Sequence, residues 1–313
     1  MRYRQLFSIV SAAIVLCSCN SDRYRSFTGY AQGGVYKVTV NMRGATASAS
    51  SIAERIESIL TEVDTTLSGY NKASQLSRYN AGELGQMSAM FQDILAVSES
   101  YRELTGGAFD VASAPLFDAW GFGFTRDSLP PSDRIQAALE ECRLGRKLNF
   151  NAIAQGYTCD LIADYLHSVG IKDMLVDIGE IYCEGHNPSG LGWSIGIDTP
   201  EDGNETPGAS LSGIWRSDGG AYGVVTSGNY RKFYIKDGRK YAHTIDPRTG
   251  YPVDHDLLSA TVVAPTAAEA DALATICMVV GPQEARELIE SLPGVEACLI
   301  QSESVWTSEG FKN

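Results

Sequence analysis

Positive charge is scarce in this chain of 313 residues, where 25 Lys and Arg stand against 38 Asp and Glu, for a formal net charge of −13. A nucleic-acid-binding surface needs clustered Lys and Arg, and the sequence shows no such footprint. An acidic protein that binds an anionic ligand needs local help from a metal ion, a helix N-terminus or a nest of backbone N–H groups. The composition therefore argues against nucleic acid as a partner.

CxxC motifs are absent from the sequence. It has seven cysteines, and an odd number of them, five, follow Cys19. This excludes the usual zinc sites and a disulfide framework. We expect those five to be buried as small apolar side chains. The sequence also lacks the GxSxG, HExxH, Walker A and strand-linked GxGxxG patterns, so none of these common motifs assigns a function.

The N-terminus has an apolar run, Leu6–Leu16, that is too short to cross a bilayer and follows two arginines, as in a signal peptide. It leads into a segment resembling a bacterial lipobox, which predicts lipidation of Cys19 and a location on the cell envelope, facing the periplasm and more readily at the inner than the outer membrane. A plain secretory peptide is the alternative. The predicted organisation is a signal peptide, a lipidated tether and one domain: residues 1–18, 19–30 and 31–313.

The rest of the chain mixes strand and helix patterns without repeats. Alternation of apolar residues predicts strands, and apolar residues three and four apart predict helices. A hairpin is expected to turn at Asp237-Gly238. Strands are expected over 32–42, 174–185 with a glycine break, 192–200 and 257–265, and residues 221–246 are expected to form a strand, a turn and that hairpin. Helices are expected over 50–67, 91–104, 132–141, within 149–170, over 266–280 and after Pro282. This pattern indicates an α+β fold of largely antiparallel strands with packed helices.

Residues 243–250 combine a histidine, an acid, a base and two turn formers. Pro247 and Gly250 predict a tight turn. His243 can act as a base near neutral pH, and the carboxylate of Asp246 can orient it. The alternative interpretation is a solvated hairpin loop with an incidental histidine.

The helix predicted over 266–280 begins with a capping box and carries Asp271 and Thr275 on one face. Because the neighbours of Asp271 are apolar or small, this carboxylate needs a partner. Carboxylate, hydroxyl and carbonyl oxygens suit a hard cation such as Mg²⁺. A solvated carboxylate near a helix N-terminus is an equally good interpretation of the spacing.

Two weaker segments are rich in small residues. The residues from Ala152 to Gly156 start a predicted helix, where backbone N–H groups suit phosphate, although tight packing is the commoner reason. In the segment 106–110, two glycines precede Phe109, which can offer a ring face, and Asp110, which can accept from ribose or adenine. In isolation that segment is more simply a loop that ends a helix.

Taken together and in order, these segments resemble the ApbE family, the FAD:protein FMN transferases. The resemblance covers about residues 32–300 and is carried by HTIDPRTG (243–250), the block 105–123, AIAQGY (152–157), DIG (177–179), SGNY (227–230) and DALAT (271–275). It implies the α+β fold of that family. It also implies Mg²⁺-dependent transfer of FMN from FAD to a threonine or serine hydroxyl of an acceptor protein, with release of AMP. The implied acceptor is an extracytoplasmic subunit of a membrane electron-transfer complex.

The resemblance also assigns residues. Asp271, Thr275 and the backbone carbonyl of Ala152 fall on the metal site. His243 is the candidate for the base that activates the acceptor hydroxyl, and Asp246 is the second catalytic candidate. The positions that fall against FAD are Gln32, Tyr70, Ala108, Phe109, Asp110, Asn149, Gln155, Thr244 and Ile245.

Some of these positions depart from the family pattern. Gln32 stands where Met is usual, Asn149 and Asn151 replace Asp and Gly, Gln155 replaces Lys or Glu, and Glu180 replaces the last glycine of DIGG. Two alternative functions therefore stay open: an FAD pyrophosphatase that yields FMN and AMP, and a non-catalytic FAD-binding lipoprotein of the periplasm.

Overall fold

The structure, a computed structural model, describes residues 23–123, 129–202, 204, 206, 208–230, 233–236 and 238–311. The predicted signal peptide and Cys19 lie outside these ranges. Within them, no helix is both long enough and apolar enough to cross a membrane.

One eight-stranded sheet organises the chain, in the order β1-β2-β3-β4-β7-β12-β13-β14, and every neighbouring pair is antiparallel. Three small ribbons, β5-β6, β8-β9 and β10-β11, lie beside it. The strands are β1 (Tyr24–Ala31), β2 (Gly34–Asn41), β3 (Met174–Asp177), β4 (Ile181–Glu184), β5 (Ser194–Asp198), β6 (Leu211–Arg216), β7 (Tyr222–Gly228), β8 (Phe233–Lys236), β9 (Arg239–Ala242), β10 (Ile245–Asp246), β11 (Tyr251–Pro252), β12 (Leu257–Ala264), β13 (Glu296–Gln301) and β14 (Val305–Thr307).

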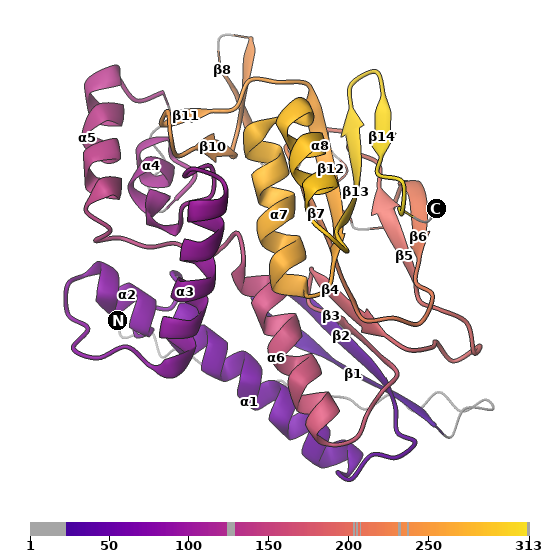
Figure 1. Ribbon diagram of the computed structural model, residues 1–313. Helices are drawn as coiled ribbons and strands as arrows, with labels where there is room; N and C mark the ends of the chain where they lie inside the picture. The colour runs from indigo at the N-terminus through magenta and orange to yellow at the C-terminus, as the bar shows by residue number, and fades with distance from the viewer. Residues whose placement is uncertain are drawn as a thin grey trace, which may run out of the picture.

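Helices cover one face of the sheet and the β5-β6 ribbon covers part of the other (Figure 1). Most of the long helices bury apolar residues in the two cores on that face, as the spacing predicts. The helices are α1 (Ala49–Leu67), α2 (Gln75–Asn80), α3 (Ala89–Leu104), α4 (Ala114–Ala119), α5 (Ser132–Arg143), α6 (Ala154–Ser168), α7 (Ala267–Val280) and α8 (Pro282–Ser291), with a 3₁₀ turn at Val111–Ser113. The α+β class predicted from the sequence is confirmed.

The start of the folded domain differs from the prediction. Residues Tyr24–Ala31, of which all but the last were expected in a tether, form β1 and pair with β2 along its full length. Its aromatics, Tyr24, Phe27 and Tyr30, are three positions apart and do not alternate. The strand lies at the sheet edge, where it needs backbone pairing more than burial. Tyr24 also donates from its hydroxyl to the His186 carbonyl, 2.8 Å away.

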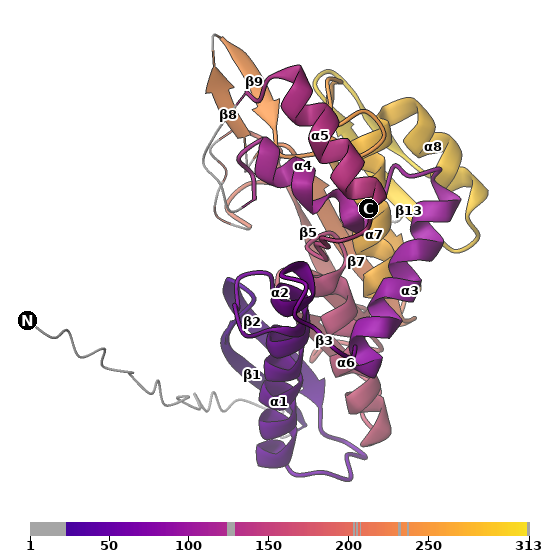
Figure 2. The ribbon, with the colours of Figure 1, turned by 90° about the vertical axis from the view of Figure 1, so that its left-hand side faces the viewer.

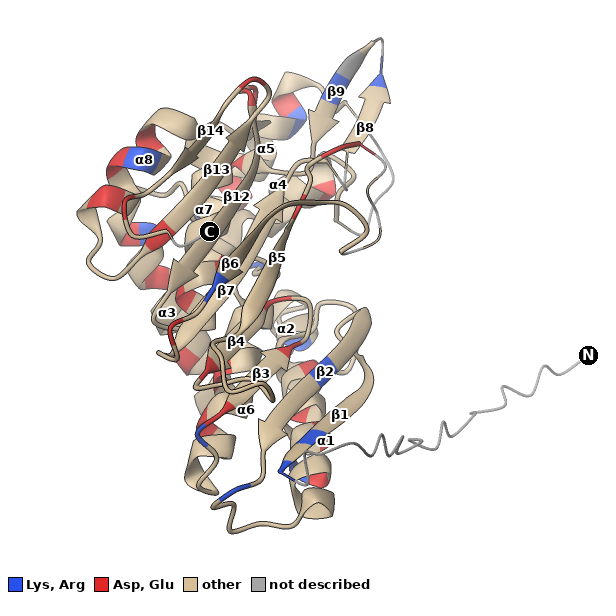
Figure 3. Ribbon diagram, turned by 90° about the vertical axis from the view of Figure 1, so that its right-hand side faces the viewer, with Lys and Arg blue, Asp and Glu red and all other residues tan. Residues whose placement is uncertain are grey.

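Two helices, α6 and α7, cross in the centre of the helical layer. Gly156 on α6 permits this, because a Cβ there would lie 2.2 Å from the Ala267 carbonyl oxygen. Helix α7 is apolar on nearly every side and is buried against β7 and β12. Lys and Arg residues are scattered over separate elements, among Asp and Glu (Figure 3). The five cysteines after Cys19 are all free and buried, as expected.

Candidate functional site

Asp271 is the only charged side chain that is fully buried within the described ranges, with 4% of its surface exposed. It lies one turn into α7, whose first turn is capped by Thr266 through the Glu269 N–H. An ionised carboxylate in such a setting requires compensation. The alternative of a solvated carboxylate on an exposed helix face is therefore wrong.

The compensation for Asp271 comes from α6. The backbone N–H of Gly156 donates to Asp271 Oδ2 at 3.0 Å. Burial raises the pKa of the Asp271 carboxyl to about 7, and the negative charge of Asp160 adds to this, while the Gly156 hydrogen bond opposes it. The other carboxylate oxygen accepts no hydrogen bond from any residue that the structure describes. A divalent cation at that oxygen would restore the charged form.

The neighbours of Asp271 offer oxygen donors. Thr275 follows one helical turn later, and its Oγ1 lies 3.5 Å from Ser227 Oγ at the end of β7. Ala152, two residues before the start of α6, is partly buried against the same core as α7. Over the part of the chain described, no three His, Cys, Asp or Glu side chains gather at a metal site. A set of one carboxylate, hydroxyls and a carbonyl fits Mg²⁺, which keeps several waters and few protein ligands.

The segment 243–250 is a packed turn and not a solvated loop. The indole N–H of Trp120 donates to the Gly250 carbonyl at 2.8 Å. Gly250 has φ +81°, and a Cβ there would contact side chains of α4 and α5. Ile245 is 2% exposed in the same cluster, and Thr244 donates to Asn229 Oδ1 at 2.6 Å. These contacts fix the backbone that follows His243; α4 and α5 lie beside the β8-β9 ribbon in Figure 2.

The prediction that the Asp246 carboxylate orients His243 is wrong. This carboxylate instead forms a forked ion pair with the Arg248 guanidinium, with N–O distances of 3.0–3.2 Å, and accepts the Arg248 N–H at 2.8 Å. This pairing raises the pKa of Arg248. A side chain two residues away in a tight turn is within easier reach than one three residues back. His243 is half-buried, with its ring edge-on to Phe122, 6.4 Å between centroids.

The segment 106–110 lies beside this turn, because a Cβ on Gly107 would be 3.9 Å from Arg248 Cγ. The prediction that Phe109 offers a ring face is wrong, since the ring is 3% exposed and packs on Tyr101. Ala108 is also fully buried, so neither side chain is open to a ligand. Asp110 caps the 3₁₀ turn at Ala112, and burial raises the pKa of its carboxyl.

The residues that depart from the family pattern make specific contacts near the start of α6. Gln32 Nε2 donates to Thr158 Oγ1 at 2.8 Å, and Gln155 Nε2 donates to the Ile178 carbonyl at 3.1 Å. Asn149 accepts the Asn151 N–H at 2.9 Å, in the turn that leads into α6.

Tyr70, which the resemblance places against FAD, lies after α1 and is 72% exposed.

Sequence reasoning missed several residues at this site. Ser227 and Asn229 lie in a segment that the family resemblance singles out, yet neither had an assigned role. Trp120 and Asp160 gave no local signal, because their partners are more than 100 residues away. Such contacts are visible only once α6, α7 and the turn are placed.

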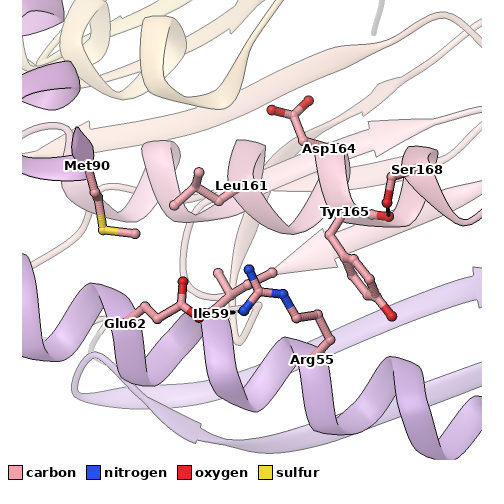
Figure 4. Close-up of a pocket in the computed structure, with 8 residues that line it drawn as sticks. All are labelled: Arg55, Ile59, Glu62, Met90, Leu161, Asp164, Tyr165 and Ser168. Carbon is pink, nitrogen blue, oxygen red and sulfur yellow. Dashed lines mark hydrogen bonds and ion pairs between the residues drawn. The ribbon is translucent and has the colours of Figure 1, made fainter. Parts of the chain in front are cut away.

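A groove of about 330 Å³ lies elsewhere, between α1 and α6 (Figure 4). It contains none of the predicted site residues. Its lining residues are Arg55, Ile59, Glu62, Met90, Leu161, Asp164, Tyr165 and Ser168.

The structure of this chain is similar to solved structures of flavin transferases. The apo structure of the Pseudomonas stutzeri flavinyl transferase ApbE matches with a TM-score of 0.80 and 32% identity, over 94% of this chain and 97% of that one. The flavin transferase ApbE from Vibrio cholerae matches with a TM-score of 0.79 and 28% identity, over 92% and 98%. The fold is thus that of the flavin transferases.

The sequence agrees with the structural likeness. A relative from Haemophilus influenzae named FAD:protein FMN transferase is 32% identical, over 90% of this chain and 88% of its own. One of the same name from Escherichia coli K12 is 31% identical, over 98% and 96%. The ApbE family model matches residues 33–299, and the chain belongs to the ApbE family.

Proposed function

We propose that this protein is an Mg²⁺-dependent FAD:protein FMN transferase, which moves FMN from FAD to a threonine or serine hydroxyl of an acceptor protein and releases AMP. Family membership supports the activity, since the curated relatives bear this name. The observation that carries the metal dependence is Asp271, which is buried in an apolar helix. Gly156 donates to one of its oxygens, and no residue within the described ranges donates to the other.

The reaction is a substitution at phosphorus. The acceptor hydroxyl oxygen forms a bond to the FMN-side phosphorus of FAD, and the bond from that phosphorus to the AMP oxygen breaks. Such chemistry requires positioning and charge neutralisation more than covalent help. Mg²⁺ held by Asp271, Thr275 and the Ala152 carbonyl would neutralise the diphosphate. In an acidic chain this local help is essential.

The remaining roles fall to residues of the packed turn. His243 takes the proton from the attacking hydroxyl. Thr244 and Ile245, fixed by Asn229 and the α4-α5 layer, hold the backbone beside the ligand. Asp246 keeps the turn closed through Arg248, and so supports His243 indirectly.

The cellular setting is part of the proposal. We infer that lipidated Cys19 anchors the protein to the periplasmic side of the cell envelope, more readily at the inner membrane. Because β1 begins at Tyr24, only a few residues separate the anchor from the folded domain. That short reach suits an acceptor that is itself an extracytoplasmic subunit of a membrane electron-transfer complex.

The test is to incubate the purified protein with FAD, Mg²⁺ and a threonine-bearing acceptor domain, and to measure the intact mass of the acceptor. We expect the acceptor to gain the mass of one FMN. The gain should require Mg²⁺ and should disappear when the acceptor threonine is replaced by valine. The Asp271→Ala variant should give no gain, whereas Arg55→Ala, in the distant groove, should behave as wild type.

Two outcomes would contradict the proposal. AMP and free FMN without a modified acceptor would indicate a pyrophosphatase. Bound FAD with neither AMP nor acceptor modification would indicate a flavin carrier, and Gln32, Asn149 and Asn151 would then be the residues to revert to the family pattern.

A further inference from the structure

Asp160 lies on α6, one turn after Gly156, and caps a different helix. Its two carboxylate oxygens accept one backbone N–H each, from Ala267 and Ala268, both at 2.8 Å. These are the first two residues of α7, whose N–H groups have no partner within the helix. Burial raises the pKa of this carboxyl to about 6, while the two hydrogen bonds oppose the rise.

The first turn of α7 therefore has two caps of different origin. Thr266 belongs to α7 itself, and its exposed hydroxyl accepts the Glu269 N–H at 3.2 Å. Asp160 belongs to α6. Both caps satisfy orphan donors, but only the one from Asp160 joins the two helices.

The cap from Asp160 is one half of a reciprocal pair. Gly156 lies one turn before Asp160 on α6, and its N–H donates to Asp271, which lies one turn after Ala267 on α7. A carboxylate of each helix thus accepts from the backbone of the other. The contact between the helices is too close for a Cβ at Gly156, so the two connections act on a rigid crossing.

The proposed metal donors are divided between these two helices. Asp271 and Thr275 project from α7, whereas the Ala152 carbonyl belongs to the turn that opens α6. Sliding of α7 along α6 would separate the two groups of oxygens. Small shifts matter because Mg²⁺ demands near-ideal octahedral geometry at about 2.1 Å.

We propose that Asp160 is a positioning residue for the metal site, fixing the register of α7 on α6 so that the donors of both helices converge on one cation. The metal part of this inference rests on the proposed function. The register itself does not, because it is a property of the protein without metal.

The experiment compares Asp160→Ala and Asp160→Asn with Thr266→Ala, which removes a cap from the same helix turn without touching α6. Mg²⁺ binding to the full-length protein is measured by calorimetry, and exchange of the Gly156 amide is measured without metal. We expect Asp160→Ala to weaken Mg²⁺ binding about 10- to 100-fold, as loss of a supporting partner around a metal ligand commonly does. Asp160→Asn, which keeps one acceptor oxygen, should fall between, and Thr266→Ala should stay near wild type.

The amide measurement separates position from stability. The hydrogen-exchange rate of the Gly156 N–H is compared between the two variants after correction for the global unfolding of each. It should be higher in Asp160→Ala than in Thr266→Ala. Equal effects of the two substitutions on Mg²⁺ binding and on Gly156 exchange would overturn the inference, because Asp160 would then be only a cap. If the wild-type protein binds no Mg²⁺, the proposed function fails, and the Gly156 exchange alone decides whether Asp160 sets the register.

Discussion

Replacing the buried carboxylate should make the metal-free protein more stable while removing its response to Mg²⁺. In the Asp271→Asn variant, the amide oxygen can still accept the Gly156 N–H that wild type uses. The amide cannot ionise, so the cost of a buried negative charge disappears. A functional group that lowers the stability of its own fold is expected where a ligand completes the site.

The magnitude follows from the pKa of Asp271, which burial raises from 3.8 to about 7. The folded protein therefore binds this proton more tightly than the unfolded chain does. As pH rises from about 4 to 7, the unfolded chain releases the proton first and wild-type stability falls. Above pH 7 the whole difference is lost, about 4 kcal/mol at 1.36 kcal/mol per pKa unit, taken as an order of magnitude.

The assay is urea unfolding with a chelator at pH 4, 5, 6, 7 and 8, for wild type and Asp271→Asn. Other titrating groups are shared, so the difference between the two free energies reports Asp271 together with its charge interaction with Asp160. It should grow in favour of the variant up to about pH 7 and then level off. Saturating Mg²⁺ should restore wild type only. Thr275→Val removes a hydroxyl but leaves every titrating group in place, so it should keep the wild-type pH dependence.

Parallel stability curves for wild type and Asp271→Asn would refute this reasoning. They would mean that the Asp271 carboxyl is solvated or paired in a way that leaves its proton affinity the same in the folded and unfolded states. A wild-type protein that gains no stability from Mg²⁺ at pH 8 would separately argue against a cation at this carboxylate.

Three further outcomes are expected. Gly156→Ala should cost about 3 kcal/mol or prevent folding, because its Cβ would lie 2.2 Å from an α7 carbonyl oxygen, whereas Gly85→Ala, in open space, should melt within a few degrees of wild type. Trp120→Phe should lower the unfolding free energy by about 1–3 kcal/mol in urea titrations, since the Gly250 carbonyl loses its donor at 2.8 Å. His243→Ala should reduce the turnover rate about 10²- to 10⁴-fold, with FAD affinity by fluorescence titration nearly unchanged; equal loss of affinity and rate would argue for a binding role.

Much of the architecture could be predicted from the sequence, because its signals are local. The capping box at Thr266 and the apolar periodicity of residues 50–67 correspond to α7 and α1. The glycine break at Gly179 separates β3 from β4, with φ +110° there. Each of these features is decided by residues a few positions apart, which is the range over which propensity and capping act.

Other features depend on partners far along the chain and could not be predicted. The edge strand β1 carries little apolar alternation, and backbone pairing with β2 decides its structure. The ring of Phe109 was expected against a ligand, but Tyr101 and the core cover it. Whether Asp246 pairs with His243 or Arg248 is settled by the geometry of the turn, not by which residues are present.

The α6-α7 crossing shows why packing and chemistry cannot be separated in this protein. Any side chain at Gly156 would push the helices apart, and the same movement would take its N–H away from Asp271. Asp271 would then be a buried charge without a hydrogen bond, which costs more than the packing defect itself. The demand for glycine at this position thus comes from two sources at once. Consider a variant with a side chain at position 156 in which a second substitution restores the close packing of α6 and α7 but not the hydrogen bond to Asp271. It should be less stable at alkaline pH than at acid pH, where Asp271 is neutral.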